Sequence, residues 1–299
     1  MVSLDPAERC SLRSREADEP LAATASTIQR WLLIAHDGPW GRDGLRDARL
    51  PEGLGDSLRA LEHRFGGRVL LIRRPNRSSG GTSGPVRCFA VDTRDAWLGS
   101  ATIDRIEGAA ALDPRDRSTF ADVGDPVFVV CTHGRRDPCC AERGRPLARA
   151  LAAAAPDATW ESTHVGGDRF AGNLVAFPHG LYFGRVEPEE AAGIARDYAD
   201  GRIGRLDRYR GRSCDPFHVQ AADRAVRDRS RADRIDDVVL ERVERSGDRA
   251  EVTFGTPGGR SAVRLARAPA APMRLTCHAT REESLPTWSV LEVRAADPG

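Results

Sequence analysis

The stretch VVCTHGRRDPCC, residues 129–140, holds three of the seven cysteines of this 299-residue chain. It continues the apolar run PVFVV, which is typical of a buried strand. The alanine-rich segment CAERGRPLARALAAAA, residues 140–155, follows and favours a helix. We therefore expect a strand that ends at Cys131 and a loop that leads into a helix near Cys140. A helix N-terminus, together with Arg135 and Arg136, favours thiolates, the form of cysteine that binds iron or zinc.

The segments that follow this helix extend the pattern. ATWESTH predicts a short strand, and NLVAFPHGLYFGRV predicts two strands around a turn at residues 178–180. EPEEAAGIARDYADG predicts a helix, with Pro188 near its start and Gly201 after its end. The order β-α-β-β-β-α is the one that a thioredoxin-like domain requires.

The preceding part of the chain shows a similar order. Strand-like runs occupy residues 31–36, 68–74, 86–92 and 96–103, and a helix-like segment lies at 56–65. A loop rich in glycine and serine, residues 76–85, separates two of these runs. This half of the chain is interpreted as a degenerate β-α-β-β-β copy of the second half.

The expected organisation of this α/β protein has four parts. Residues 1–26 form a polar arm, mobile or used for docking, and residues 27–120 form an N-terminal α/β domain. Residues 121–230 form the thioredoxin-like domain. Residues 231–299 alternate apolar and polar positions between turns, which predicts a small β-rich region.

Composition excludes several classes of protein. The 45 basic and 44 acidic residues nearly cancel, so no basic excess indicates a nucleic-acid partner. We expect no signal peptide, because the N-terminus is polar and charged, and no membrane span, because no apolar run of about 18 residues occurs. The cysteines are not spaced like a secreted disulfide framework, so a reducing cytoplasm is the expected location.

A second loop can supply further ligands. ESTHVGGDRFAGN contains His164 and Asp168 with three residues between them, and its two glycines allow a tight backbone turn. Because this loop also follows a strand, it can lie beside the cysteine loop at the same edge of the sheet. From these residues alone, three uses of the cysteines stay open: a metal site, thiol redox chemistry and plain core packing. A thioredoxin-type dithiol would need C-x-x-C spacing, which does not occur here.

The combination of CTHGRRDPCC, HVGGDRFAGN and YFGRV resembles the sucrase/ferredoxin-like family over about residues 10–230. The resemblance implies a thioredoxin-like ferredoxin domain that carries a [2Fe–2S] cluster. In family members with histidine ligands, two cysteines bind one iron and the histidines of an H-x3-H motif bind the other. Cys131, Cys140 and His164 match this pattern, whereas Asp168 stands where the family has its second histidine.

The function that this resemblance implies is that of a soluble electron carrier, rather than an enzyme with catalytic residues. The expected ligands are Cys131, Cys140, His164 and Asp168, and an anionic Asp168 should lower the reduction potential relative to a neutral histidine. An unidentified reductase or acceptor protein is the expected partner. It would dock on a face formed by the arginines that flank the ligands, namely Arg135, Arg136 and Arg169.

Several alternatives remain at this point. Cys139 competes with Asp168 for the fourth ligand position, and His133 and Cys214 are remoter candidates. A thiol-redox protein could act through Cys131, Cys139 or Cys140. A zinc-binding structural or regulatory protein, or a relative without a cluster, would also fit these residues.

Overall fold

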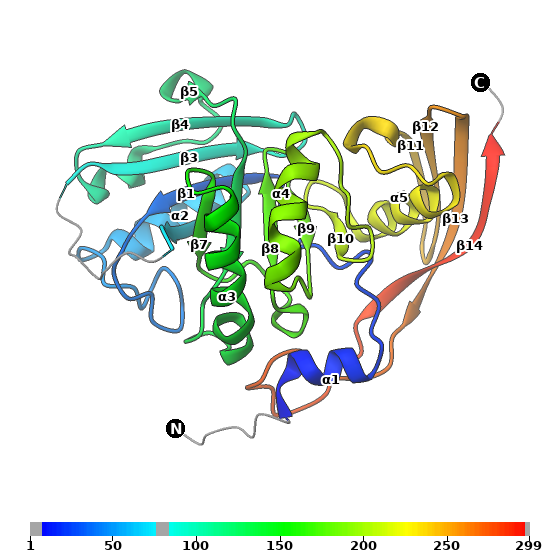
Figure 1. The fold of residues 1–299 in the computed structure, drawn as a ribbon, viewed down its shortest axis with the longest axis horizontal. Helices are drawn as coiled ribbons and strands as arrows, with labels where there is room; N and C mark the ends of the chain where they lie inside the picture. The colour runs from blue at the N-terminus through cyan, green and yellow to red at the C-terminus, as the bar shows by residue number, and fades with distance from the viewer. Residues whose placement is uncertain (1–7, 76–83, 297–299) are drawn as a thin grey trace.

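The computed structural model describes residues 8–75 and 84–296, so most of the predicted loop at 76–85 lies outside the described residues. The chain forms a large mixed sheet of ten strands and a separate antiparallel sheet of four strands (Figure 1). The strands of the large sheet are β1 (Arg30–Ala35), β2 (Arg68–Arg73), β3 (Val86–Asp92), β4 (Trp97–Ile103), β5 (Ala121–Asp122), β6 (Val127–Cys131), β7 (Thr159–Ser162), β8 (Leu174–Phe177), β9 (Leu181–Phe183) and β10 (Tyr209–Arg212). The helices are α1 (Cys10–Glu16), α2 (Leu54–Phe65), α3 (Pro138–Ala154), α4 (Ala191–Ala199) and α5 (Phe217–Ser230). The mixed α/β class predicted from the sequence is confirmed.

The large sheet contains the same unit twice. In the first half, β1 pairs in parallel with β2 and antiparallel with β3, which pairs antiparallel with β4. In the second half, β6 pairs in parallel with β7 and antiparallel with β8, which pairs antiparallel with β9. One helix, α2 or α3, links the two parallel strands of each unit. The predicted β-α-β-β-β copy is therefore present in the fold.

A short antiparallel contact joins the two units into one sheet. It lies between β2 and β7 and consists of the pairs Ile72–Ser162 and Arg73–Glu161. Arg73 also donates a hydrogen bond to the carboxylate of Glu161 at 2.8 Å. The strand order across the whole sheet is β10-β9-β8-β6-β7-β2-β1-β3-β4-β5.

Both faces of this sheet are buried because strand β6 and the middle residues of β1 and β2 are apolar. Alternate residues point to opposite faces, so Leu32 packs under α2 while Trp31 packs in a second core. That second core draws side chains from both units, and the Trp31 ring lies 5.5 Å from the Phe177 ring. The sheet therefore curls around a shared core, and Cys131 and Cys140 belong to that core.

The C-terminal sheet consists of β11 (Val239–Ser246), β12 (Arg249–Thr256), β13 (Gly259–Pro269) and β14 (Pro286–Ala296). The small β-rich region predicted for residues 231–299 is thus a four-stranded antiparallel sheet. Helix α5, which the sequence had assigned to the preceding domain, packs Val219 and Val226 into the apolar core of this sheet. The reason is that its two apolar side chains lie seven residues apart on one face of the helix.

The N-terminal segment packs against the rest of the protein in its described part. Helix α1 lies beside the segment that precedes β14, shown in orange in Figure 1, and Cys10 is fully buried. Arg9 forms an ion pair with Glu142 of α3. The sequence predicts a mobile or docking arm for residues 1–26. The described part of this segment is packed instead, because its Cys10 is buried although most of its other residues are polar. Within the described residues, none of the helices combines the length and hydrophobicity that a membrane crossing needs.

Candidate metal centre

The cysteine loop connects a fully buried strand to a capped helix. Strand β6 ends at Cys131, and α3 begins at Pro138, a residue type favoured in the first turn of a helix. The side chain of Asp137 caps the helix by accepting a hydrogen bond from the backbone N–H of Cys139 at 2.9 Å. Cys131 and Cys140 are both 1% exposed. The fold thus brings two thiols from the ends of this loop into the apolar core.

The second predicted loop follows β7 and depends on two glycines. Gly166 and Gly167 have φ values of 103° and 80°, which side chains rarely tolerate. They turn the backbone between His164 and Asp168, as the sequence predicted. Asp168 begins a short 3₁₀ helix, Asp168–Phe170, and is almost completely buried.

The two loops meet at one edge of the sheet. The sulfurs of Cys131 and Cys140 and a ring nitrogen of His164 all lie within 4.8 Å of one another. Oδ1 of Asp168 lies 3.1 Å from Sγ of Cys140 and 2.9 Å from Nδ1 of His164. The structure therefore brings all four residues singled out in the sequence into one cluster, in which Asp168 contacts Cys140 and His164.

The charges in this cluster depend strongly on one another. The neighbouring Cys140 thiol lowers the pKa of Cys131 despite burial, and the same contact raises the pKa of Cys140. Burial disfavours protonation of His164, but Asp168 and Cys131 outweigh it and raise its pKa to about 9. Burial also acts on Asp168, yet the contact with His164 brings its pKa below the ordinary value. These shifts favour the thiolate form of Cys131 and the carboxylate form of Asp168, and both anions are donors that suit a cation.

The donor set fits a metal or an iron–sulfur cluster. Nδ1 of His164 is buried, and Oδ1 of Asp168 lies 2.9 Å from it as its ion-pair partner. Two thiols, an imidazole and a carboxylate are ligands that iron and zinc both accept.

The model of the sucrase/ferredoxin-like family matches residues 21–211, which is more than half of the chain.

The chain belongs to the sucrase/ferredoxin-like family.

Relatives of this family member include two yeast proteins named Altered inheritance of mitochondria protein 32. The protein from Meyerozyma guilliermondii is 34% identical over 100 residues, or 30% of this chain and 36% of that protein. The protein from Debaryomyces hansenii is 30% identical over 100 residues, or 30% of this chain and 37% of that protein. The matched part thus spans little more than a third of the length of these relatives.

Solved structures that are similar to this chain include the thioredoxin-like [2Fe–2S] ferredoxin from Aquifex aeolicus. It is 17% identical, with a TM-score of 0.27, and the match covers 31% of this chain and 97% of the ferredoxin. A cysteine-to-serine variant of the same ferredoxin is 20% identical, with a TM-score of 0.24, and the match covers 28% of this chain and 96% of the variant.

In this sucrase/ferredoxin-like chain, a buried arginine supports the His164 loop. The guanidinium of Arg210 is completely enclosed, and it donates hydrogen bonds to the carbonyl of Gly166 at 3.1 Å and to the side chain of Asn173 at 2.7 Å. Asn173 in turn donates to the carbonyl of Gly167 at 2.8 Å. Burial lowers the pKa of Arg210 to about 10. Sequence reasoning missed this residue, because one arginine among many in an arginine-rich chain carries no distinguishing pattern.

The remoter candidates for ligands have other surroundings. Nδ1 of His133 accepts a hydrogen bond from the N–H of His164 at 3.2 Å, and its Nε2 donates to the carbonyl of Gly41 at 2.9 Å. Both ring nitrogens are therefore used, and His133 acts as a link between loops. The side chain of Cys139 turns away from Cys140 and lies 3.3 Å from the sulfur of Cys277. Cys214 contacts the carboxylate of Asp215.

The three flanking arginines differ in their surroundings. Arg135 and Arg136 are exposed on the cysteine loop. Arg169 is largely buried, and it forms an ion pair with Glu19 of the N-terminal segment at 2.8 Å. Of the three arginines named in the predicted docking face, Arg135 and Arg136 are thus exposed, whereas Arg169 is paired with Glu19.

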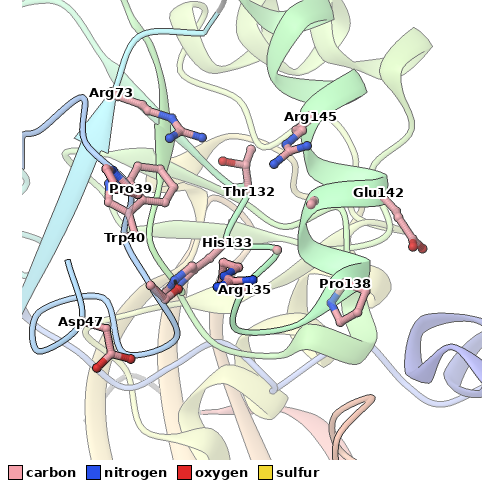
Figure 2. Close-up of a pocket in the computed structure, with 13 residues that line it drawn as sticks. Pro39, Trp40, Asp47, Arg73, Thr132, His133, Arg135, Pro138, Glu142 and Arg145 are labelled. Carbon is pink, nitrogen blue, oxygen red and sulfur yellow. Dashed lines mark hydrogen bonds between the residues drawn. The ribbon is translucent and has the colours of Figure 1, made fainter. Parts of the chain in front are cut away.

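A cavity of about 730 Å³ opens beside the cysteine loop (Figure 2). Three arginines line it, namely Arg73, Arg135 and Arg145, together with Trp40 and His133. The guanidinium of Arg73 stacks 4.1 Å from the Trp40 ring, which holds both side chains at the cavity wall. Asp47 and Glu142 line the cavity as well, and Arg73 is paired with Glu161. The cavity adjoins the loop that carries Cys131 and Cys140.

Proposed function

We propose that this protein carries a [2Fe–2S] cluster held by Cys131, Cys140, His164 and Asp168, and that it acts as a one-electron carrier. The observation that supports this most is the meeting of two enclosed thiols with a ring nitrogen of His164 and the buried carboxylate of Asp168. Membership of the sucrase/ferredoxin-like family agrees with it. A bound cluster of this kind supplies reversible one-electron transfer.

The surrounding residues can hold the four ligands in place and limit access of water. Cys131 and Cys140 lie in the apolar core, and Arg210 with Asn173 fixes the glycine turn of the other loop. His164 is the most exposed of the four, with 23% of its side chain accessible. We infer that electrons enter and leave on the His164 side, where the distance to a partner is shortest.

The partner in this proposal is a protein with an acidic docking face. Arg135 and Arg136 present positive charge on the cysteine loop, and the adjoining cavity adds Arg145. Complementary charge of this kind mainly increases the rate at which partners meet.

The test begins with anaerobic purification of the full-length chain, followed by absorbance, electron paramagnetic resonance and iron and sulfide analysis. We expect a coloured protein with about two irons per chain and a paramagnetic reduced state. Cys131→Ser and His164→Ala should lose most of the iron, whereas Cys214→Ser, a cysteine outside this cluster, should keep it.

Three outcomes would contradict the proposal. A colourless protein without iron would exclude the cluster, and zinc in place of iron at these residues would indicate a structural centre. A reversible disulfide between Cys131 and Cys140 in iron-free protein would indicate thiol redox chemistry instead.

A further inference from the structure

A second group of cysteines lies on the other side of the first turn of α3. Sγ of Cys139 is 3.7 Å from Sγ of Cys10 and 3.3 Å from Sγ of Cys277, and the last two sulfurs are 3.5 Å apart. The carboxylate of Asp137 completes the group, with Oδ2 3.7 Å from the Cys10 sulfur. All four donor atoms lie within 4.8 Å of one another, and all four residues are buried. The group joins three segments that are far apart in the sequence.

We propose that this group binds a single zinc ion, with Cys10, Cys139 and Cys277 as thiolate ligands and Asp137 as the fourth ligand. Zinc in structural sites is tetrahedral with zinc–sulfur distances of about 2.3 Å, which places two ligand sulfurs roughly 3.8 Å apart. The three sulfur separations in this group, 3.3 to 3.7 Å, approach that value. An iron–sulfur cluster that used a different iron for each cysteine would need more widely separated sulfurs.

Three backbone N–H groups point at donor atoms of this group. Asp137 accepts hydrogen bonds from the backbone N–H of Cys139 at 2.9 Å and of Cys277 at 2.7 Å. The N–H of Cys10 points at the sulfur of Cys277 at 3.4 Å. Such contacts orient ligands and offset their charge, which is how outer-shell groups support metal sites. Each carboxylate oxygen has a second lone pair, so Asp137 can accept these bonds and still bind the ion.

A disulfide explains fewer of these features. A bond between Cys139 and Cys277 would leave Cys10 as a buried thiol beside the buried carboxylate of Asp137. A tetrahedral ion uses all four side chains, and four protein ligands leave no open position for a substrate. The inferred role is therefore structural: the ion fastens α1 and the segment before β14 to the start of α3.

The experiment measures zinc in the full-length protein purified without added metal or chelator. We expect one zinc ion per chain in the wild type, and the same content in the double variant Cys131→Ser/Cys140→Ser, which removes thiols only from the other group. Cys10→Ser and Cys277→Ser should lose the zinc, while the control Cys214→Ser should keep it. Asp137→Asn should retain zinc with an affinity weakened by roughly 10- to 100-fold.

A second measurement uses the wild type alone, so it does not depend on folding of the variants. One equivalent of Zn²⁺ is added to metal-depleted protein, and the cysteines are alkylated and located by mass spectrometry. Zinc should protect Cys10, Cys139 and Cys277 and leave Cys214 as reactive as before. Protection confined to Cys131 and Cys140, or a native disulfide between Cys139 and Cys277 in zinc-free protein, would overturn the proposal. Either result could occur with or without an iron–sulfur cluster, so the two proposals can fail separately.

Discussion

Asp168 is the residue that sets the charge of the proposed cluster. It contributes a carboxylate where the two-histidine pattern would place a neutral ring, and it contacts both Cys140 and His164. An anionic ligand stabilises the oxidised state of iron more than a neutral one does. A substitution of this residue should therefore change the reduction potential of the cluster.

Asp168→His tests this directly. We expect the variant to keep its cluster and to raise the midpoint potential by roughly 100 mV, in the direction of histidine-ligated centres. Protein-film voltammetry or a redox titration followed by absorbance gives the value. Asp56→His, on the exposed face of α2, is the matched control and should leave the potential unchanged. An unchanged or lowered potential in Asp168→His would show that Asp168 is not a ligand.

His179 offers a test of stability against pH that is separate from the metal centres. Burial lowers its pKa to about 4, and Arg212 acts in the same direction. Nδ1 of this ring lies 2.6 Å from the hydroxyl of Tyr198. Because the folded-state pKa is below the unfolded value near 6.5, the unfolded chain takes up the proton first as the pH falls. The stability from neutral His179 is present above pH 6.5 and is lost toward pH 4.

His179→Gln should remove this part of the pH dependence. Between pH 7 and pH 5, the wild type should lose about 2 kcal/mol more free energy of unfolding than the variant does. Urea unfolding at a series of pH values measures both curves. Parallel curves for the two proteins would mean that His179 titrates normally in the folded state.

Sequence spacing identified the residues of the proposed cluster site but not those of the proposed zinc site. Cys131, Cys140, His164 and Asp168 lie in two loops that each follow a strand, so a strand order is enough to predict their meeting. Cys10 and Cys277 are 267 residues apart and lie outside any regular pattern. Only tertiary packing of α1 and the segment before β14 brings them to Cys139.

At the scale of elements, the glycine turn between His164 and Asp168 depends on close packing as well as on backbone freedom. A Cβ atom on Gly167 would lie 2.5 Å from a guanidinium nitrogen of Arg210. That guanidinium cannot move aside easily, because it is enclosed and fixed by hydrogen bonds to Thr24, Gly166 and Asn173.

Gly167→Ala should therefore lower the free energy of unfolding by more than backbone strain alone predicts. Gly53 is the matched control, since its φ of 75° is close to the 80° of Gly167 and nothing lies within 4 Å of its Cβ position. We expect Gly53→Ala to cost about 1 kcal/mol, and Gly167→Ala to cost roughly 2 kcal/mol more because of overpacking. Thermal unfolding and iron content measure the two effects. Equal losses in both variants would show that Arg210 does not constrain the turn.

The strands and helices of the large sheet were largely predictable from the sequence, and their joining was not. The apolar runs at β1, β2 and β6 and the amphipathic spacing of α2 are local signals. The contact between β2 and β7 involves only two residue pairs at the strand ends, so no local pattern marks it. The assignment of α5 to the C-terminal sheet likewise depends on which apolar surface lies nearest in space.

At the scale of the whole molecule, the net charge is almost zero, so any electrostatic guidance of a partner must come from local charge. Arg135 and Arg136 are the exposed charges on the loop between the two cysteine ligands. Arg136 lies close enough to Asp168 that its charge helps to lower the pKa of that carboxyl.

Reversal of both charges should slow electron exchange with anionic reagents. For Arg135→Glu/Arg136→Glu, we expect the oxidation rate with an anionic one-electron complex to fall roughly tenfold at low ionic strength. High salt should remove most of the difference, because it screens exposed charges. Stopped-flow absorbance gives the rates. Arg105→Glu/Arg242→Glu makes the same change in net charge at other exposed positions, and a similar slowing there would argue against a local docking face.

The adjacent cysteines at the start of α3 have a consequence for the molecule as a whole. Consecutive helical side chains point roughly 100° apart, so Cys139 and Cys140 lie on different sides of a single turn and belong to different groups of ligands. With both groups filled, an electron added to the group that contains Cys140 would repel the anionic ligands of the group that contains Cys139. Thermodynamic linkage then requires the converse. Loss of the zinc ion from the Cys139 group shifts the reduction potential at the Cys140 group by the same free energy. The proposed structural zinc site and the proposed electron-transfer site would thus be energetically coupled through two residues joined by one peptide bond.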